Sequence, residues 1–232
     1  QLVKTLADIQ NSGHEVIIVS SGAIGLGMGK LGLRERPKDT PGKQACAAVG
    51  QCELMYLYDN LFAEYSITVA QMLLTKYILL EDRRKNVENA MERLIAHGVI
   101  PIINENDTVA IDELELEVGE NDSLAATVAA IAKADLLIIM SDIDGLYDKD
   151  PHTYNDARLI PVVHKITDDI RALAGGAGTK LGTGGMITKL NAVEIAYDSD
   201  IDVVLMNGQH PKTLYDLFDG KTVGTFFCKK PD

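Results

Sequence analysis

The chain has 232 residues, 46% of them hydrophobic, and a mean hydropathy of +0.03, which is enough apolar material for one large or two small soluble domains. It contains no apolar run of the roughly 18 residues that a transmembrane helix needs, and its amphipathic first residues do not resemble a signal peptide. Lys and Arg number 22 against 34 Asp and Glu, so the formal net charge is −12. This balance argues against non-specific binding to nucleic acid, which depends on neutralising phosphates.

The three cysteines, Cys46, Cys52 and Cys228, are odd in number and form no CxxC pair. No histidines lie near them at the spacing of a zinc site. We therefore interpret them as reduced thiols, which are typical of a cytoplasmic protein.

Helical and strand-like patterns alternate along the chain. The predicted helices cover residues 1–12, 44–65, 82–97, 122–133, 185–198 and 213–218, and the predicted strands cover 14–20, 67–73, 99–103, 135–141, 202–206 and 222–227. The glycine-rich segment SGAIGLGMG after the first strand is interpreted as a turn, Gly98 as a helix C-cap and Asp122 as a helix N-cap. Residues 108–118 alternate apolar and polar side chains, as a hairpin with one exposed face does.

This order of elements predicts an α/β fold in which helices cover both faces of a mainly parallel sheet. The strand DLLIIMS is almost entirely apolar, as buried parallel strands are. No linker, repeat or low-complexity segment divides the sequence, so we expect a single compact domain over residues 1–232.

Polar residues cluster at the ends of four predicted strands and before one helix. The clusters are residues 20–23, 104–107, 119–122, 141–142 and 207–208. Turns of this kind are rich in polar residues for structural reasons alone. Ligands of open α/β sheets nevertheless bind at the carboxyl ends of the strands, so five clusters together predict a binding site at one sheet edge.

A glycine-rich segment, AGGAGTKLGTGGMITKL, spans residues 174–190 and has six glycines within residues 175–185. Glycine lets backbone approach a ligand closely, and the N–H groups at a helix start bind phosphate. Lys189, one turn into the following helix, can swing back toward an anion held there. The P-loop motif GxxxxGK[ST] does not occur. Gly25 and Gly27 fit the first two glycines of the dinucleotide fingerprint GxGxxG, but its third glycine position is occupied by Lys30. A hydride-transferring enzyme is therefore disfavoured.

Five segments together resemble the amino acid kinase family, and within it the glutamate 5-kinases, in order and spacing. They are VSSGAIGLG, PIINENDTVA, GENDSLAATVA, SDIDGLYDKDP and LGTGGMITKL. The resemblance covers essentially the whole chain. It implies a three-layer α/β/α sandwich with a mainly parallel central sheet, and ATP-dependent phosphorylation of the γ-carboxylate of L-glutamate, the first step of proline biosynthesis. It also implies Mg²⁺ as a cofactor, a homo-oligomer, and proline as a feedback inhibitor.

The resemblance also implies roles for individual residues. Lys189 would contact the transferring phosphoryl group, and Asp122 would organise the catalytic lysines. No protein ligand for the metal is evident. The implied glutamate contacts are Ser21, Gly22, Ala23, Asn104, Asp107 and Asn121, and the implied nucleotide contacts are Ser141, Asp142, Thr183, Gly184, Gly185, Met186, Ile187, Thr188 and Lys189.

The implied chemistry needs no general base, because a carboxylate with a pKa near 4.3 is already ionised at neutral pH. What it needs is in-line positioning and neutralisation of the charge on the moving phosphoryl group. Backbone N–H groups, a lysine and Mg²⁺ are suited to both tasks.

The sequence departs from the family pattern at its start. That pattern opens with a strand carrying K-x-G-[ST], whose lysine also contacts the phosphoryl group, whereas this sequence begins downstream of it. We therefore expect the 232 residues alone to lack one strand and one catalytic charge, and to be inactive. Many relatives carry a PUA domain after GTFF, and in this sequence that domain is either absent or cut away.

Two other functions remain as alternatives. The first is a sister kinase that acts on aspartate, N-acetylglutamate, carbamate or UMP, although NEND and GENDSL favour glutamate. The second is a non-catalytic sensor or storage protein on the same fold, against which the presence of both Lys189 and Asp122 argues.

Overall fold

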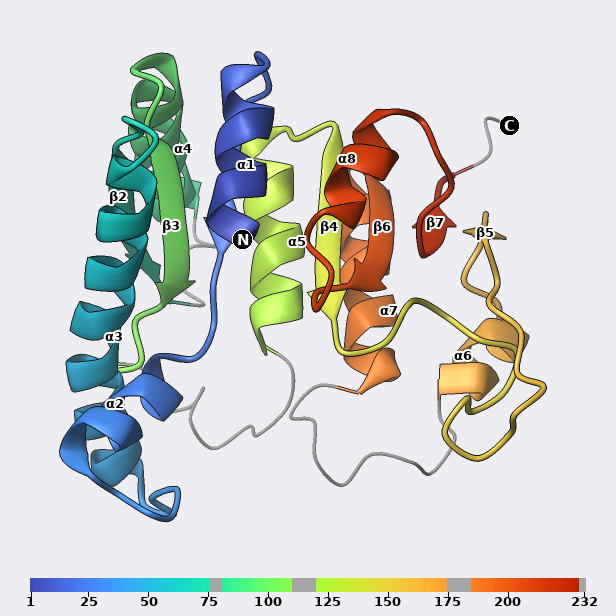
Figure 1. Ribbon diagram of the computed structural model, residues 1–232, viewed down its shortest axis with the longest axis horizontal. Helices are drawn as coiled ribbons and strands as arrows, with labels where there is room; N and C mark the ends of the chain where they lie inside the picture. Colours follow the sequence, from blue (N-terminus) through green and yellow to red (C-terminus); the bar gives the residue numbers. More distant parts are fainter. Residues whose placement is uncertain (76–80, 110–119, 175–184, 230–232) are drawn as a thin grey trace. The chain divides into compact units, whose positions relative to one another are not determined.

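The computed structural model describes residues 1–75, 81–109, 120–174 and 185–229. They group into two compact units, although the sequence shows no linker: a first unit within residues 2–117, and a second within 118–232 that also includes Gln1. Each unit has its own sheet, seen as separate sets of arrows in Figure 1. In the part of the chain that is described, no helix combines the length and the apolar character needed to cross a bilayer.

The first unit is a parallel three-stranded sheet with four helices. Its sheet order is β1-β3-β2, and both pairings are parallel. Its elements are α1 (Leu2–Asn11), β1 (Ile18–Val19), α2 (Ala23–Leu31), α3 (Thr40–Ala63), β2 (Val69–Leu74), α4 (Glu81–Ala96) and β3 (Ile100–Glu105).

Strand β3 is buried on both of its faces. Ile100 and Ile102 pack in one cluster with α1 and with Phe62 of α3. Pro101 and Ile103 point to the opposite face, because side chains alternate along a strand, and they are buried as well. This double burial explains why VIPII has no polar position, as expected of a central parallel strand.

Helix α2 corrects one expectation, because most of the predicted glycine-rich turn is helical. Gly22 starts α2 in the left-handed region, with φ of 99°. A Cβ built on Gly27 would lie 1.8 Å from the carbonyl oxygen of Cys46, and one on Gly50 would lie 1.6 Å from that of Ala23. These two glycines therefore serve close packing of α2 on α3, which outweighs the low helix propensity of glycine.

The same segment contains a dinucleotide-type spacing that the structure explains. Residues 27–32, GMGKLG, match GxGxxG, in addition to the failed match at Gly25 and Gly27. Gly27 and Gly29 lie inside α2 and Gly32 is its C-cap. The fingerprint requires these glycines in a turn between strand and helix, so this match does not mark a dinucleotide site.

The second unit is a four-stranded sheet of mixed direction. Its order is β4-β6-β7-β5, with β4–β6 and β5–β7 parallel and β6–β7 antiparallel. Its elements are α5 (Glu120–Ala132), β4 (Leu136–Ser141), β5 (Val162–Val163), α6 (Asp168–Ala174), α7 (Met186–Tyr197), β6 (Asp202–Asn207), α8 (Thr213–Phe218) and β7 (Thr225–Phe227).

Both faces of this sheet are also buried. Val203 and Leu205 of β6 belong to the core cluster that includes α5 and α7. Val204 and Met206 alternate to the other face and are buried too. Figure 1 shows α7 and α8 on opposite sides of β6, which is the helix-covered arrangement predicted for an α/β chain.

The α/β class and the mainly parallel sheets are confirmed. Two short elements, β5 and α6, were not predicted, and the first strand is shorter than expected because only Ile18 and Val19 pair with β3. The predicted hairpin at 108–118 falls mainly on 110–119, outside the described residues.

Candidate active site

Polar side chains gather at the carboxyl end of the sheet in the second unit. Ser141 ends β4 opposite Asn207 of β6, and the Gly208 N–H donates to the Ser141 carbonyl at 2.7 Å. The Ser141 hydroxyl donates to Asp142 Oδ1 at 3.1 Å. The structure thus brings together, at one sheet edge, two of the five clusters seen in the sequence, as parallel strands should.

Helix α7 begins beside this edge with a bare N-terminus. Its N-cap is Gly185, in extended backbone, which has no side chain to cap the first N–H groups. These groups and the positive end of the helix therefore favour an anion. Gly185 is the described end of the segment whose Thr183 and Gly184 lie outside the described residues.

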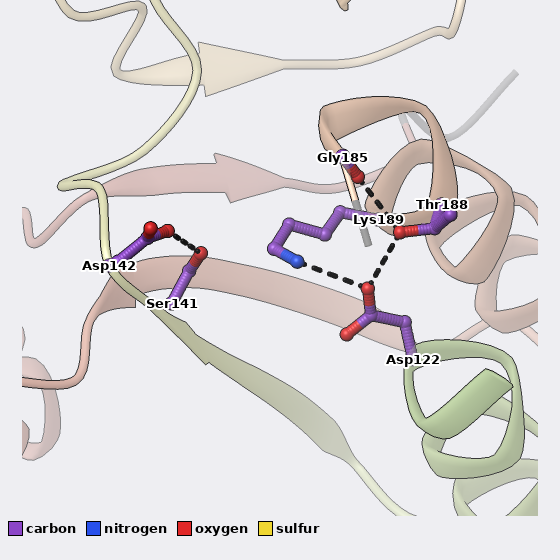
Figure 2. Close-up of polar contacts among 6 residues, drawn as sticks. All are labelled: Asp122, Ser141, Asp142, Gly185, Thr188 and Lys189. Carbon is purple, nitrogen blue, oxygen red and sulfur yellow. Dashed lines mark hydrogen bonds and ion pairs between the residues drawn. The ribbon is translucent and has the colours of Figure 1, made fainter. Parts of the chain in front are cut away.

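Lys189, Thr188 and Asp122 form a compact polar cluster at the start of α7. The Lys189 ammonium donates to Asp122 Oδ2 at 3.1 Å, and the Thr188 hydroxyl lies 2.9 Å from the same oxygen. Figure 2 shows the Lys189 side chain with Asp122 on one side and the Ser141–Asp142 pair on the other. One carboxylate thus fixes both the lysine and the first turn of α7.

The ion pair in this cluster is shielded from solvent. The side chains of Lys189 and Asp122 are only 12% and 19% exposed. Charges at such sites are screened less by water and salt than surface pairs are. Asp122 thus holds the Lys189 ammonium group close to the start of α7, whose backbone N–H groups favour phosphate.

Asp122 corrects a second expectation. It was predicted as the N-cap of its helix, but α5 begins at Glu120, so Asp122 lies in the first turn. Its carboxylate bonds α7 side chains and ties the starts of α5 and α7 together.

A cavity of 380 Å³ lies on the same unit, around the end of β6 and α8. Asn207 Nδ2 donates to Asp144 Oδ1 at 2.8 Å, and the Tyr147 hydroxyl donates to Asp144 Oδ2 at 3.1 Å. Burial first, and then the bond to Asp144, raise the pKa of Tyr147, so it remains a neutral donor. The lining residues are Asp144, Met206, Asn207, His210, Thr213, Asp216, Lys221, Thr222, Val223 and Gly224.

The first unit has its own polar edge. The Ser20 N–H donates to the Ile103 carbonyl at 2.9 Å, which places the start of α2 beside Asn104. Ser21 and Gly22 are exposed there, and Gly22 brings no side chain to cap α2. This second bare helix start also suits an anionic group.

The predicted site residues divide between the two units. Ser21, Gly22, Ala23, Asn104 and Asp107 lie on the first unit, at the ends of β1 and β3. Asn121, Asp122, Ser141, Asp142 and residues 185–189 lie on the second. Direct contacts join Asp122 with Thr188 and Lys189, and Ser141 with Asp142, and the roles of all these residues remain predictions.

Sequence reasoning missed two polar groups that the structure reveals. One is the Asp144–Tyr147 contact, although SDIDGLYDKDP was singled out as a motif. The other is Gln51, a buried side chain whose Oε1 accepts from Asn104 Nδ2 at 2.9 Å. A glutamine between the apolar helix positions Ala47 and Leu54 was the available signal.

Comparison with known proteins identifies the family. The model of the amino acid kinase family matches residues 1–207. The chain belongs to the amino acid kinase family. Glutamate 5-kinase of Clostridium tetani (strain Massachusetts / E88) is 54% identical over 227 residues, which cover 97% of this chain and 84% of the relative. Glutamate 5-kinase of Clostridium perfringens (strain 13 / Type A) is 49% identical over 233 residues, covering 99% and 87%.

Solved structures agree on the fold of this amino acid kinase. A crystal structure of T. acidophilum isopentenyl phosphate kinase in a product complex has a TM-score of 0.58 at 18% identity, covering 97% of this chain and 90% of that one. Another isopentenyl phosphate kinase structure has a TM-score of 0.62 at 15% identity, covering 97% and 89%. At such low identity these matches establish the amino acid kinase fold alone.

Proposed function

We propose that this amino acid kinase transfers the γ-phosphoryl group of ATP to the γ-carboxylate of L-glutamate and forms γ-glutamyl phosphate, the first step of proline biosynthesis. The observation that carries the proposal is the identity of 46–54% to glutamate 5-kinases over at least 97% of the chain. The Lys189–Asp122–Thr188 cluster supports it, because a shielded lysine at a bare helix start suits phosphoryl transfer.

The substrates are assigned to the two units by their chemistry. On the second unit, the N–H groups at the start of α7 and the Lys189 ammonium neutralise phosphate charge, while Ser141 and Asp142 hold the nucleotide. The 380 Å³ cavity lined by Asp144 and Asn207 offers room for the nucleoside part. On the first unit, Ser21, Gly22 and Ala23 at the start of α2 hold the acidic amino acid, with Asn104 and Asp107.

The role of Lys189 follows from the charge that moves during the reaction. The transferring phosphoryl group carries its charge on equatorial oxygens, and catalysis consists of positioning and electrostatic stabilisation. Asp122 keeps the Lys189 Nζ near the start of α7. The acceptor carboxylate is already an anion, so no residue has to remove a proton.

Mg²⁺ is proposed as the companion of ATP. Among the described residues, no group of three or more Asp, Glu, His or Cys side chains is arranged to hold a metal ion. Mg²⁺ in kinases is bound mainly by phosphates and water with one or two carboxylates, so this donor set fits an ion that arrives with the nucleotide. The carboxylates on either side of Lys189 are Asp122 and Asp142, and the ion would neutralise charge on the β- and γ-phosphates.

The test is a turnover assay on the full-length protein with L-glutamate, ATP and Mg²⁺, in which hydroxylamine traps the acyl phosphate. ADP release is measured in parallel with aspartate, N-acetylglutamate, carbamate and UMP, because phosphorylated UMP is not an acyl phosphate. We expect glutamate to give the highest kcat/KM. Higher turnover of one of the other acceptors would assign the chain to a sister kinase, and nucleotide binding without turnover would assign it to a sensor.

Replacing the lysine tests the mechanism within the same assay. Lys189→Ala should lower kcat by about two to three orders of magnitude, as removal of one stabilising group typically does, and change the KM for glutamate little. Arg171→Ala is the matched control, because Arg171 lies on α6 and pairs with Glu194 at the surface. An equal loss in both variants would contradict the role of Lys189.

The family resemblance adds two further proposals for this chain. Proline would act as a feedback inhibitor, and the protein would assemble as a homo-oligomer. Inhibition curves with added proline and light scattering of the purified protein test them independently of the turnover assay.

A further inference from the structure

Gln51 lies at the centre of the buried face of α3. The positions four before, one before and three after it, Ala47, Gly50 and Leu54, are buried, and Gln51 itself is only 8% exposed. Apolar side chains normally fill such a stripe. A glutamine there needs a polar environment that the helix itself does not provide.

Only one end of the Gln51 amide is satisfied within the described residues. Oε1 accepts a hydrogen bond from Asn104 Nδ2 at 2.9 Å. Nε2 is buried and has no partner among these residues. A buried polar group without a partner destabilises the fold, so native proteins rarely keep one without a reason.

The surroundings of this amide are the proposed amino-acid site of the first unit. The backbone of Gly50 packs against the Ala23 carbonyl so closely that a Cβ would lie 1.6 Å from it. The Ser20 N–H bonds the Ile103 carbonyl, and Asn104 follows directly. Gln51 Nε2 therefore lies near the start of α2 and the ends of β1 and β3.

We propose that Gln51 is a further substrate-binding residue, whose Nε2 donates a hydrogen bond to a carboxylate oxygen of the acidic amino acid. The inference rests on the proposed function. Nε2 is a donor only, so it matches a carboxylate rather than the ammonium group of the substrate. Asn104 holds the amide in this orientation, and hydrogen bonds to charged acceptors are the stronger kind.

Two substitutions separate the donor from the rest of the side chain. Gln51→Met keeps the volume and removes both polar atoms. Gln51→Glu keeps an acceptor for Asn104 but replaces the donor with a negatively charged oxygen. Gln71→Met is the matched control, because Gln71 is exposed on β2 of the same unit.

The experiment measures the KM for glutamate and for ATP by hydroxylamine trapping, after urea unfolding has shown that each variant is folded. Gln51→Met should raise the KM for glutamate about 10- to 100-fold, as loss of a hydrogen bond to a charged group does. Gln51→Glu should raise it further, since two carboxylates would then face each other. The KM for ATP should stay within about twofold, as should both constants in Gln71→Met.

Two results would overturn the inference in different ways. If wild type turns over glutamate and the folded variants keep its KM within about twofold, Nε2 faces only a buried water. If the full-length wild type does not turn over glutamate at all, the proposed function fails and the inference fails with it. Should Gln51→Met be unfolded, Gln51→Glu decides, because it retains the Asn104 bond.

Discussion

The hydroxyl of Thr188 has one proton and two acceptors within reach. Asp122 Oδ2 lies 2.9 Å away and the Gly185 carbonyl 2.8 Å away. Because the carboxylate is charged, we expect the Thr188 hydroxyl to donate its hydrogen bond to Asp122 rather than to the Gly185 carbonyl. Thr188 would then align Asp122, and through it Lys189.

This role gives a prediction for a nearly isosteric pair of variants. Thr188→Val should lower kcat about tenfold or more, since a hydrogen bond to a charged group is lost, with little change in the KM for either substrate. Thr188→Ser should restore most of the rate because it restores the hydroxyl. Steady-state kinetics of the three proteins measure this, and equal rates for Ser and Val would show that the hydroxyl has no such role.

Asp202, the first residue of β6, gives a prediction about pH. Burial raises its pKa above the usual 3.8, so the folded protein binds its proton more tightly than the unfolded chain does. As pH rises through this window the unfolded state loses its proton first, and the free energy of unfolding falls. Above the window the buried charge remains a cost.

The expected outcome is that Asp202→Asn raises the melting temperature at pH 7. The gain should shrink as the pH falls through the raised pKa of Asp202, because the wild-type carboxyl becomes protonated in the folded state. Thermal unfolding of both proteins at several pH values measures the difference. A gain that is the same at pH 4 and pH 7 would show that the carboxyl charge is not its cause.

At these single positions, the resemblance predicted that Lys189 and Asp122 act together, and the structure places them 3.1 Å apart. Spacing alone could not predict this, because 66 residues separate them and only the packing of α5 on α7 brings them together. The N-cap assigned to Asp122 was wrong for a related reason. A local signal at the helix start was outweighed by a long-range partner.

At the scale of elements, the pairing of α2 with α3 depends on glycines that leave no room for a side chain. Gly27→Ala would place a Cβ against backbone of Cys46, which cannot move without separating the helices. Overpacking of this kind costs about 1–3 kcal/mol or more. Because α2 also begins at the proposed amino-acid site, we expect weaker glutamate binding as well.

Gly29 on the same helix provides the control for this prediction. It is exposed, and a Cβ there would meet nothing within 4 Å. Gly29→Ala should therefore stabilise the protein by about 0.5–1 kcal/mol through helix propensity. Urea unfolding of the two variants compares them, and destabilisation by both would contradict the packing argument.

The elements that sequence reasoning predicted well are those with long, regular patterns. Helix α4 and strands β4 and β6 lie within one or two residues of their expected bounds. Helix α3 begins four residues early, at Thr40, because the Asp39 side chain caps it and Pro41 fits its first turn. The helical state of α2 and the antiparallel direction of β7 could not be predicted, since tertiary packing and chain path determine them.

At the scale of the whole molecule, composition contained no sign of the division into two compact units. A boundary is visible in sequence when it falls in a polar or Gly/Pro-rich linker, and the residues around Val118 alternate as a strand pair would. The division into two units nevertheless matches the division between the proposed substrate sites. Most residues proposed for the acidic amino acid lie on the first unit, and those proposed for the nucleotide lie on the second.

This separation predicts that the two substrates can be perturbed one at a time. Asp107→Asn, on the first unit, should raise the KM for glutamate about tenfold or more, because the amide would lack the negative charge that we propose pairs with the substrate's ammonium group. Asp142→Asn, on the second unit, should raise the KM for ATP and leave that for glutamate unchanged.

The double variant then measures whether the units act independently in binding. Residues with separate partners and separate cores usually show additive free energies, within about 0.3–0.5 kcal/mol. We therefore expect the changes in kcat/KM of Asp107→Asn and Asp142→Asn to multiply in the double variant. A coupling energy above about 1 kcal/mol would mean that one substrate alters the site of the other, and would contradict independent binding by the two units.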